Sequence, residues 1–209
     1  MSTSDLPIFP IAYFPPVHWF AAALKYDRIV LEISQFYRKQ QYTSRAHVRL
    51  PNQVYPLTIP VERRGARVPI ADKKITFTES WQQQHWRSLV TAYRNSPYFE
   101  YYEDRLQPLF EREFERLIDL HVAILDLVFP WLSHQPELLL SQSFQPSEAY
   151  SKDFRGDFDP ARKKFPDWFV EVPYPQVFGE FEVGLSILDL LFNEGPNSRS
   201  ILLNSWKES

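Results

Sequence analysis

The start of the chain alternates short apolar runs with proline-marked turns. Residues 8–14 (IFPIAYF) are apolar and extended in character, and Pro15 ends them. Pro16 suits the first turn of a helix that runs to about Lys25. Residues 29–34 are apolar enough for an inner strand. This order predicts a strand, a helix and a parallel second strand joined by a right-handed crossover.

Two further β-rich runs, 46–50 and 54–61, flank a proline- and asparagine-containing turn at 51–53. This pattern predicts a hairpin. The next segment, 62–72, is expected to be an exposed, solvated loop because it carries a run of arginines, Arg63, Arg64 and Arg67. Residues 74–77 are expected to add one more short strand.

The middle of the chain has helical periodicity. Ser80 and Gln83 have the spacing of a capping box, and the helix that they begin is expected to reach about Asn95. A short helix is expected over 98–105. The longest helix is expected over 108–130, where one apolar stripe is bounded by a proline at each end.

The last third of the chain changes character twice. Leu138 opens an apolar run, which predicts a second inner strand as far as about Phe144. Residues 145–175 mix charged and aromatic residues without a period, which predicts a long irregular arm. Apolar spacing then predicts helices over 185–192 and 198–206. The predicted fold class is α/β, with a small, mixed, partly parallel sheet flanked by helices, in one domain spanning 1–209.

Composition narrows the class of protein. Apolar residues make up 44% of the chain and aromatic residues 16%, which is enough for a large core and argues against disorder. A net charge of −3 argues against a nucleic-acid partner. The absence of cysteine excludes disulfides, thiolate metal sites and a cysteine nucleophile. No signal peptide and no apolar run of membrane-spanning length is visible, so we expect a cytoplasmic protein.

The densest polar set follows the predicted inner strand. Glu32 ends the apolar run, and Tyr37, Lys39, Gln40 and Arg45 come soon after it. Open α/β sheets bind ligands beyond the carboxyl ends of their strands, so this pattern predicts a polar site there. Arg45 would hold a carboxylate or phosphate in fork geometry, and Lys39 would add a point charge. The alternative is a solvated connection in which Arg45 pairs with Glu32 as a structural ion pair.

Two histidines lie on predicted helix stripes. His85 shares its stripe with Trp81, Leu89 and Tyr93, and is either a general base or a hydrogen-bonded histidine at the edge of the core. His121 lies on the apolar stripe of the longest predicted helix and is interpreted as structural. No HxH or HExxH pattern occurs, so no metal site is predicted, and the sequence identifies no cofactor.

Several short motifs together resemble the WbqC-like proteins, in the order of that family and over nearly the whole chain. The resemblance is closest to the shorter form common in Bacteroidetes. The motifs are Tyr13-Phe14-Pro15-Pro16, Lys39-Gln40-Gln41-Tyr42-Thr43-Ser44-Arg45, Ile59-Pro60-Val61, Trp81 with His85-Trp86, Tyr93, Ser96-Pro97-Tyr98-Phe99, and the stretch from Leu185 to Pro196 (LSILDLLFNEGP).

The resemblance implies a role in bacterial surface polysaccharide (O-antigen) biosynthesis. It implies a transferase of glycyl or acyl type that acts on a sugar or sugar-nucleotide precursor, so the expected partner is a small molecule: an amino acid, a sugar or a sugar nucleotide. The alternative is a non-catalytic ligand-binding or assembly protein that keeps the fold.

The chain departs from the family pattern in its first motif. Where many relatives have His-Gln-Pro, this chain has Phe9, Pro10 and Ile11, so that histidine is absent. The asparagine of a frequent Asn-Arg pair is replaced by Ser44. The missing histidine favours the non-catalytic alternative.

The site hypothesis gives each candidate a role. The catalytic candidates are His85, as general base, and Glu32. Arg45 and Lys39 are expected to hold an anionic part of the substrate. The other substrate-binding candidates are Tyr13, Tyr37, Gln40 and Asn193.

Overall fold

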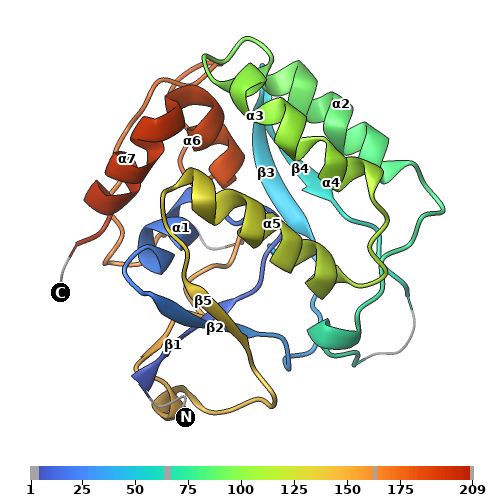
Figure 1. The fold of residues 1–209 in the computed structure, drawn as a ribbon, viewed down its shortest axis with the longest axis vertical. Helices are drawn as coiled ribbons and strands as arrows, with labels where there is room; N and C mark the ends of the chain where they lie inside the picture. Colours follow the sequence, from blue (N-terminus) through green and yellow to red (C-terminus); the bar gives the residue numbers. More distant parts are fainter. Residues whose placement is uncertain (1–4, 64–66, 162–163, 208–209) are drawn as a thin grey trace.

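A parallel sheet lies at one end of the molecule and a β-hairpin lies apart from it, with helices around both (Figure 1). The computed structural model describes residues 5–63, 67–161 and 164–207, so Arg64 of the predicted loop lies outside the described residues. The four-stranded sheet has the order β5-β2-β1-β6, and all its pairs are parallel. Its strands are β1 (Pro7–Pro10), β2 (Arg28–Glu32), β5 (Glu137–Leu140) and β6 (Lys152–Asp153). The predicted α/β class with a partly parallel sheet is confirmed.

The predicted strand-helix-strand start is also confirmed. Helix α1 (Val17–Ala23) connects β1 to β2, and the register places Ile8 opposite Val30. Every residue of α1 is buried, because the helix packs between the sheet and the C-terminal helices. Pro16, predicted to be the first residue of the helix, is instead its N-cap residue in an extended conformation, so the helix begins one residue later than predicted.

The predicted hairpin consists of β3 (Arg45–Leu50) and β4 (Gln53–Thr58), with Arg45 opposite Thr58. Alternation decides which side chains enter the core. Ala46 and Val48 are buried, whereas His47 between them points to the other face of the hairpin and is only partly buried.

Besides α1, six α-helices of the described residues surround these sheets, with α2, α3 and α4 grouped over the hairpin (Figure 1). The longest predicted helix is interrupted, because Arg112 and Arg116 have extended backbones and the chain between them pairs with 73–75. Only isolated bridges form at 74–77, so the short strand predicted there was wrong. The helices are α2 (Trp81–Tyr93), α3 (Phe99–Leu106), α4 (Pro108–Glu111), α5 (Leu117–Trp131), α6 (Ile187–Glu194) and α7 (Ser198–Asn204).

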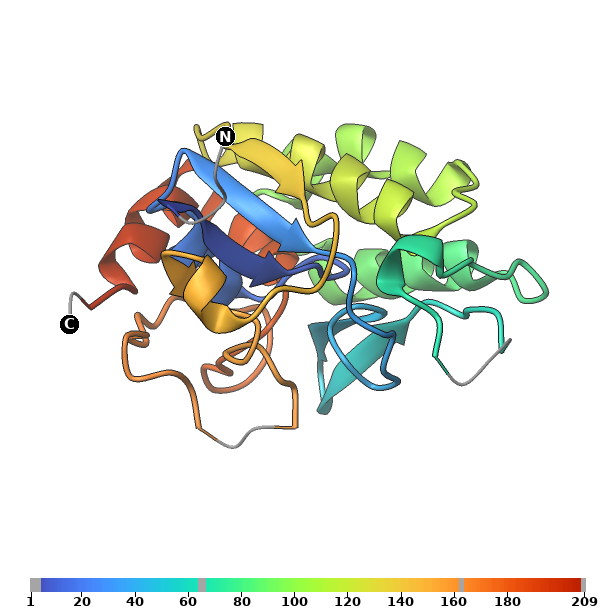
Figure 2. The same ribbon diagram turned by 90° about the horizontal axis from the view of Figure 1, so that it is seen from below.

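Three further predictions need correction. The Ser80 side chain makes no capping hydrogen bond at α2. Strand β5 is an edge strand rather than an inner one, and Leu140 at its end is exposed. The arm is not wholly irregular, because β6 within it pairs with β1 and makes β1 an inner strand. Figure 2 shows the rest of the arm, in orange, looping on the same side of the sheet as the hairpin.

Candidate functional site

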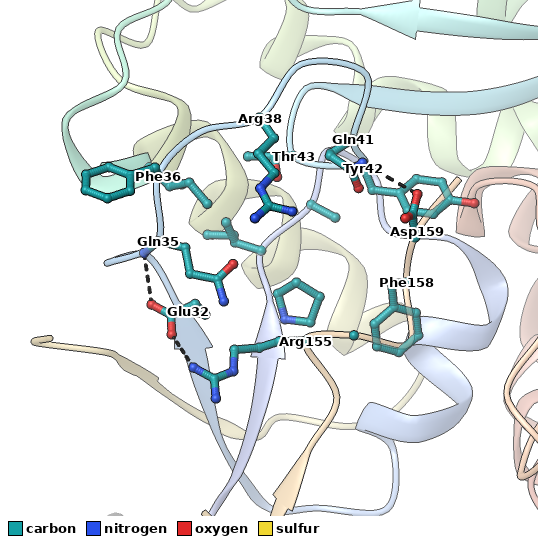
Figure 3. A pocket seen from close by; sticks show the side chains of 15 residues that line it. Glu32, Gln35, Phe36, Arg38, Gln41, Tyr42, Thr43, Arg155, Phe158 and Asp159 are labelled. Atoms are coloured by element: carbon teal, nitrogen blue, oxygen red, sulfur yellow. Dashed lines mark hydrogen bonds and ion pairs between the residues drawn. The ribbon is translucent and has the colours of Figure 1, made fainter. Parts of the chain in front are cut away.

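A cavity of about 230 Å³ opens beyond the carboxyl ends of β1 and β2, and we call it the strand-end cavity (Figure 3). Pro10 and Glu32, the last residues of those two strands, both line it. This is where an open α/β sheet is expected to bind a ligand. Its charged and amide side chains are Glu32, Gln35, Arg38, Gln41, Arg155 and Asp159.

Glu32 is held by hydrogen bonds on both carboxylate oxygens and is only 1% exposed. Oε1 accepts from the backbone N–H of Ser34 at 2.7 Å and of Gln35 at 3.2 Å, and from Ser141 Oγ at 2.9 Å. Oε2 accepts from Arg155 Nη1 at 2.9 Å. The partner of Glu32 is therefore Arg155, not Arg45 as the structural alternative had it.

Arg155 reaches this position because β6 carries the arm past the end of β1. Its guanidinium also forms two hydrogen bonds with Asp153, at 2.9 Å from Nε and 2.7 Å from Nη2. These bonds, with burial opposing them, raise the pKa of Arg155. No pattern in the sequence connects this arginine with Glu32, because 123 residues separate the two along the chain.

A second cavity, of about 850 Å³, lies beside the hairpin, and we call it the hairpin cavity. It brings together four of the predicted binding residues. The cations Arg63 and Lys73 line it as well, together with the acids Glu62 and Glu79. The four predicted residues are Tyr37, Lys39, Gln40 and Arg45.

The cations of the hairpin cavity differ in how they are held. Within residues 5–63, 67–161 and 164–207, neither Lys39 nor Arg45 forms an ion pair, and the buried Arg45 Nε has no hydrogen-bond partner. Lys73 is buried, with its ammonium 4.9 Å from the centre of the Tyr37 ring. Its Nζ donates to the backbone oxygen of Glu62 at 2.6 Å. The cavity therefore presents positive charge with spare hydrogen-bond donors, which suits an anionic ligand.

The segment 35–45 forms a wall of both cavities. Tyr37, Lys39 and Arg45 line the hairpin cavity, while residues between them line the strand-end cavity. Gln40 turns the chain with a φ of 63°, a left-handed conformation that is uncommon without glycine. The polar residues that follow one another closely in this segment therefore line two different cavities.

His85 and Tyr13 lie in the core behind the hairpin. The Tyr13 hydroxyl is 3.0 Å from His85 Nδ1, and both side chains are buried. Burial lowers the pKa of His85 to about 4, although the backbone of Thr58 opposes the shift. The imidazole is therefore neutral at physiological pH. Neither residue is among those that line the two cavities.

Asn193 lies on α6, also away from both cavities. Its Nδ2 donates to the backbone oxygen of Asp189 at 2.8 Å. The Asp189 carboxylate is fully buried and accepts from Tyr174 at 2.8 Å and from Gln176 at 3.0 Å, which fastens the arm to the helix. The tail motif is thus part of the core.

Asp189→Asn is expected to raise the free energy of unfolding at pH 8 by about 1–3 kcal/mol, since a neutral amide avoids burying a charge. Burial raises the pKa of Asp189 to about 6, above its ordinary value of 3.8, so the wild type loses stability as pH rises from 4 through 6. Urea unfolding at pH 8 and pH 5.5 measures the difference. An equal effect at both pH values would contradict the explanation.

Two classes of feature are missing from the described parts of the chain. None of their His, Cys, Asp and Glu side chains gather in a group of three or more that could hold a metal ion. Among the same residues, no helix has the length and apolar character needed to cross a membrane.

Comparison with known proteins agrees with the sequence motifs. No solved structure shows a significant match to this chain. The uncharacterized protein Rv1507c of Mycobacterium tuberculosis is 23% identical over 217 residues, which cover 91% of this chain and 94% of that protein. The sequence model of the WbqC-like protein family matches residues 11–158 and 161–201. Since these residues make up most of the chain, it belongs to the WbqC-like protein family.

Proposed function

We propose that this protein is a transferase of glycyl or acyl type that acts on a sugar or sugar-nucleotide precursor of a bacterial surface polysaccharide. The observation that carries the proposal is the hairpin cavity, where Lys39 and Arg45 have no ion-pair partner within the described residues. Its volume of about 850 Å³ falls in the range of small-molecule and cofactor sites.

Each of the four predicted binding residues in the hairpin cavity then has a physical role. The Arg45 guanidinium would donate two parallel hydrogen bonds to a phosphate or carboxylate, and Lys39 would add a mobile point charge. Tyr37 would form a wall whose ring is fixed by the hydrogen bond between its hydroxyl and Ser44 Oγ, at 2.8 Å. Gln40 would contribute an amide at the rim.

In the transfer, the acceptor's hydroxyl or amine would attack the acyl carbonyl of an activated donor, and the bond from that carbonyl to the donor's leaving group would break. A base would take the proton from the attacking group. His85 is in the neutral form that a base requires. Glu32 is a carboxylate at the neighbouring cavity. In this proposal these two residues are the catalytic candidates.

A specific observation favours the non-catalytic alternative, ligand binding or assembly without turnover. The two catalytic candidates are engaged elsewhere, His85 with Tyr13 and Glu32 with Arg155. A protein that only binds its ligand would need the cations of the hairpin cavity but not a free base. The two functions therefore share the binding prediction and differ in product formation.

Arg45→Gln is expected to weaken the binding of a nucleoside diphosphate sugar by about 10–100-fold, the effect of losing a charge-assisted hydrogen bond worth about 1.5–3 kcal/mol. Isothermal titration calorimetry with uridine and guanosine diphosphate sugars measures this. Arg87→Gln, an exposed change on α2, is the matched control and should bind as the wild type does. Unchanged affinity in Arg45→Gln would refute the proposed site, and a lower melting temperature alone would assign Arg45 to the scaffold.

Product formation separates the transferase from the binding protein. The wild type and His85→Gln are incubated with an activated glycyl or acyl donor and the sugar nucleotide that binds, and mass spectrometry detects the acylated sugar. Product from the wild type but not from His85→Gln supports the transferase. Tight binding without product from either protein supports the alternative.

A further inference from the structure

A third cavity, of about 330 Å³, has walls from the hairpin, the arm and α1, and we call it the arm cavity. Figure 2 shows the arm on the same side of the sheet as the hairpin. The lining combines aromatic rings with imidazole and carboxylate groups, and it shares no residue with the hairpin cavity. The side chains that give it this chemistry are His18, Tyr42, His47, Asp157, Asp159 and Phe165.

Two carboxylates line the arm cavity without a cation to neutralise them. Neither Asp157 nor Asp159 forms an ion pair within the part of the chain that the structure describes. Trp168 Nε1 donates to Asp157 Oδ2 at 2.8 Å, and the backbone N–H of Ala161 donates to Asp159 Oδ1 at 2.9 Å. The other charged side chains of the lining are paired, Lys164 with Asp167 and Glu182 with Arg49. Each of the two aspartates therefore keeps lone pairs for the donors of a ligand.

His18 brings a hydrogen-bond donor to the arm cavity from α1. The residue is 2% exposed, and burial lowers its pKa to about 3, so the imidazole is neutral and carries one N–H. Its Nδ1 is buried without a hydrogen-bond partner among the described residues. Buried N–H groups are rarely left without an acceptor, so the proton lies on Nε2. Nε2 makes no hydrogen bond with a described residue either, so its N–H is available to a ligand.

Aromatic rings surround these polar groups. The centre of the His18 ring is 5.0 Å from that of Phe165 and 6.3 Å from that of Tyr42, and the Tyr42 ring is 5.5 Å from that of His47. Burial, together with the charge of Asp159, raises the pKa of Tyr42 to about 12, so this carboxylate lies near the ring (Figure 3). Flat surfaces, an acceptor and a donor thus occur together, which suits a planar ring with hydrogen-bonding groups on its edge.

Strand β3 connects the arm cavity with the hairpin cavity. Arg45 lines the hairpin cavity and His47 lines the arm cavity. The two residues are separated by one position on the strand, so their side chains lie on the same face with Cα atoms about 7 Å apart. Burial, together with the charge of Arg45, lowers the pKa of His47, so the two side chains are close. A ligand whose anionic part binds Arg45 can therefore extend into the arm cavity.

We infer that the arm cavity binds the guanine base of a guanosine diphosphate sugar whose phosphates occupy the hairpin cavity. The Asp159 carboxylate would accept from N1–H and N2–H, and among the common bases only guanine has two such donors side by side on this edge. O6, on the same edge, would accept from His18 Nε2. Uracil would bring carbonyl oxygens against the carboxylates, and a small organic cation would leave the His18 donor unmatched. This assignment rests on the proposed function for the phosphates and the sugar, and it adds which base is selected.

Calorimetry with guanosine, inosine and uridine diphosphates, without an attached sugar, tests the choice of base. Inosine diphosphate has the ring and phosphates of the guanosine compound but lacks the 2-amino group. The wild type is expected to bind guanosine diphosphate about 10–100-fold more tightly than inosine diphosphate, the effect of one charge-assisted hydrogen bond. Uridine diphosphate should bind more weakly than guanosine diphosphate by at least the same factor.

Two variants should change this preference in different ways. Asp159→Asn is expected to lose most of the preference for guanosine over inosine diphosphate. His18→Phe should weaken the binding of both by the same factor, because both carry O6. Glu180→Gln, which removes the charge of an exposed glutamate in the arm, is the matched control and should keep the affinities of the wild type.

The outcomes for the two cavities are separable. Equal binding of the three diphosphates overturns the guanine assignment alone, provided that Arg45→Gln still weakens all of them. A preference for guanosine diphosphate that Arg45→Gln leaves at full affinity refutes the proposed hairpin site instead. If Asp159→Asn keeps the preference of the wild type, or only lowers the melting temperature, Asp159 does not read the base and the assignment is overturned.

Discussion

Glu32→Ala is expected to lower the free energy of unfolding by about 3–5 kcal/mol, the range for breaking a buried ion pair from one side. The change leaves Arg155 without one of its two carboxylates and removes the acceptor of Ser141 and of two backbone N–H groups. Each donor that stays buried without an acceptor adds its desolvation penalty. The loss should be large because the Arg155 side chain is only 7% exposed and water reaches it poorly.

Urea unfolding at pH 7.5 measures this loss, with Glu171→Ala as the matched control on an exposed glutamate of the arm. Glu32→Gln should be milder, because the amide oxygen still accepts hydrogen bonds. The double variant Glu32→Ala, Arg155→Ala should be less destabilised than the sum of the single variants. A loss below about 1 kcal/mol in Glu32→Ala would be typical of an exposed pair and would contradict the buried network.

The protein is expected to lose stability steeply when the pH falls below about 6.5. Burial lowers the pKa of His18 and His121 to about 3 and that of His85 to about 4. These values lie below the unfolded value of 6.5, so protons bind first to the unfolded chain. From pH 6.5 to pH 5 the expected loss is about 2 kcal/mol for each of the three histidines, and the loss continues until the folded pKa is reached.

Urea midpoints between pH 8 and pH 5 measure this slope. His18→Phe replaces one imidazole by a ring of similar shape. This variant should lose less stability as the pH falls, and the difference should equal the contribution of that one histidine. Asp189 acts in the opposite direction below pH 6, because its pKa is raised rather than lowered. The measurement is therefore best made in Asp189→Asn, and a flat profile in that background would contradict three buried neutral histidines.

The parts of the fold that the sequence could predict are local. The β1-α1-β2 unit and the β3-β4 hairpin depend on short apolar runs with prolines at their ends, and each partner is close along the chain. The interruption of the longest predicted helix was missed because 115–117 pairs with 73–75, a contact that no periodicity records.

The sequence could predict which stretch of the chain lines the cavities, but not which cavity each side chain enters. The stretch from Glu32 to Arg45 is rich in polar side chains, and its residues do line cavities. Which cavity each side chain enters depends on the turn at Gln40, and the partner of Glu32 depends on a two-residue strand in the arm. Strands this short carry no measurable alternation, so Arg155 could not be anticipated.

The wall formed by 35–45 has a thermodynamic consequence for any two ligands that occupy its two sides. A ligand that shifts this segment on one side must also change the surface presented on the other side. Linkage then requires the two affinities to change by the same factor, whichever ligand arrives first. Any cooperativity between ligands in the two cavities, positive or negative, would therefore be transmitted by this single stretch of backbone.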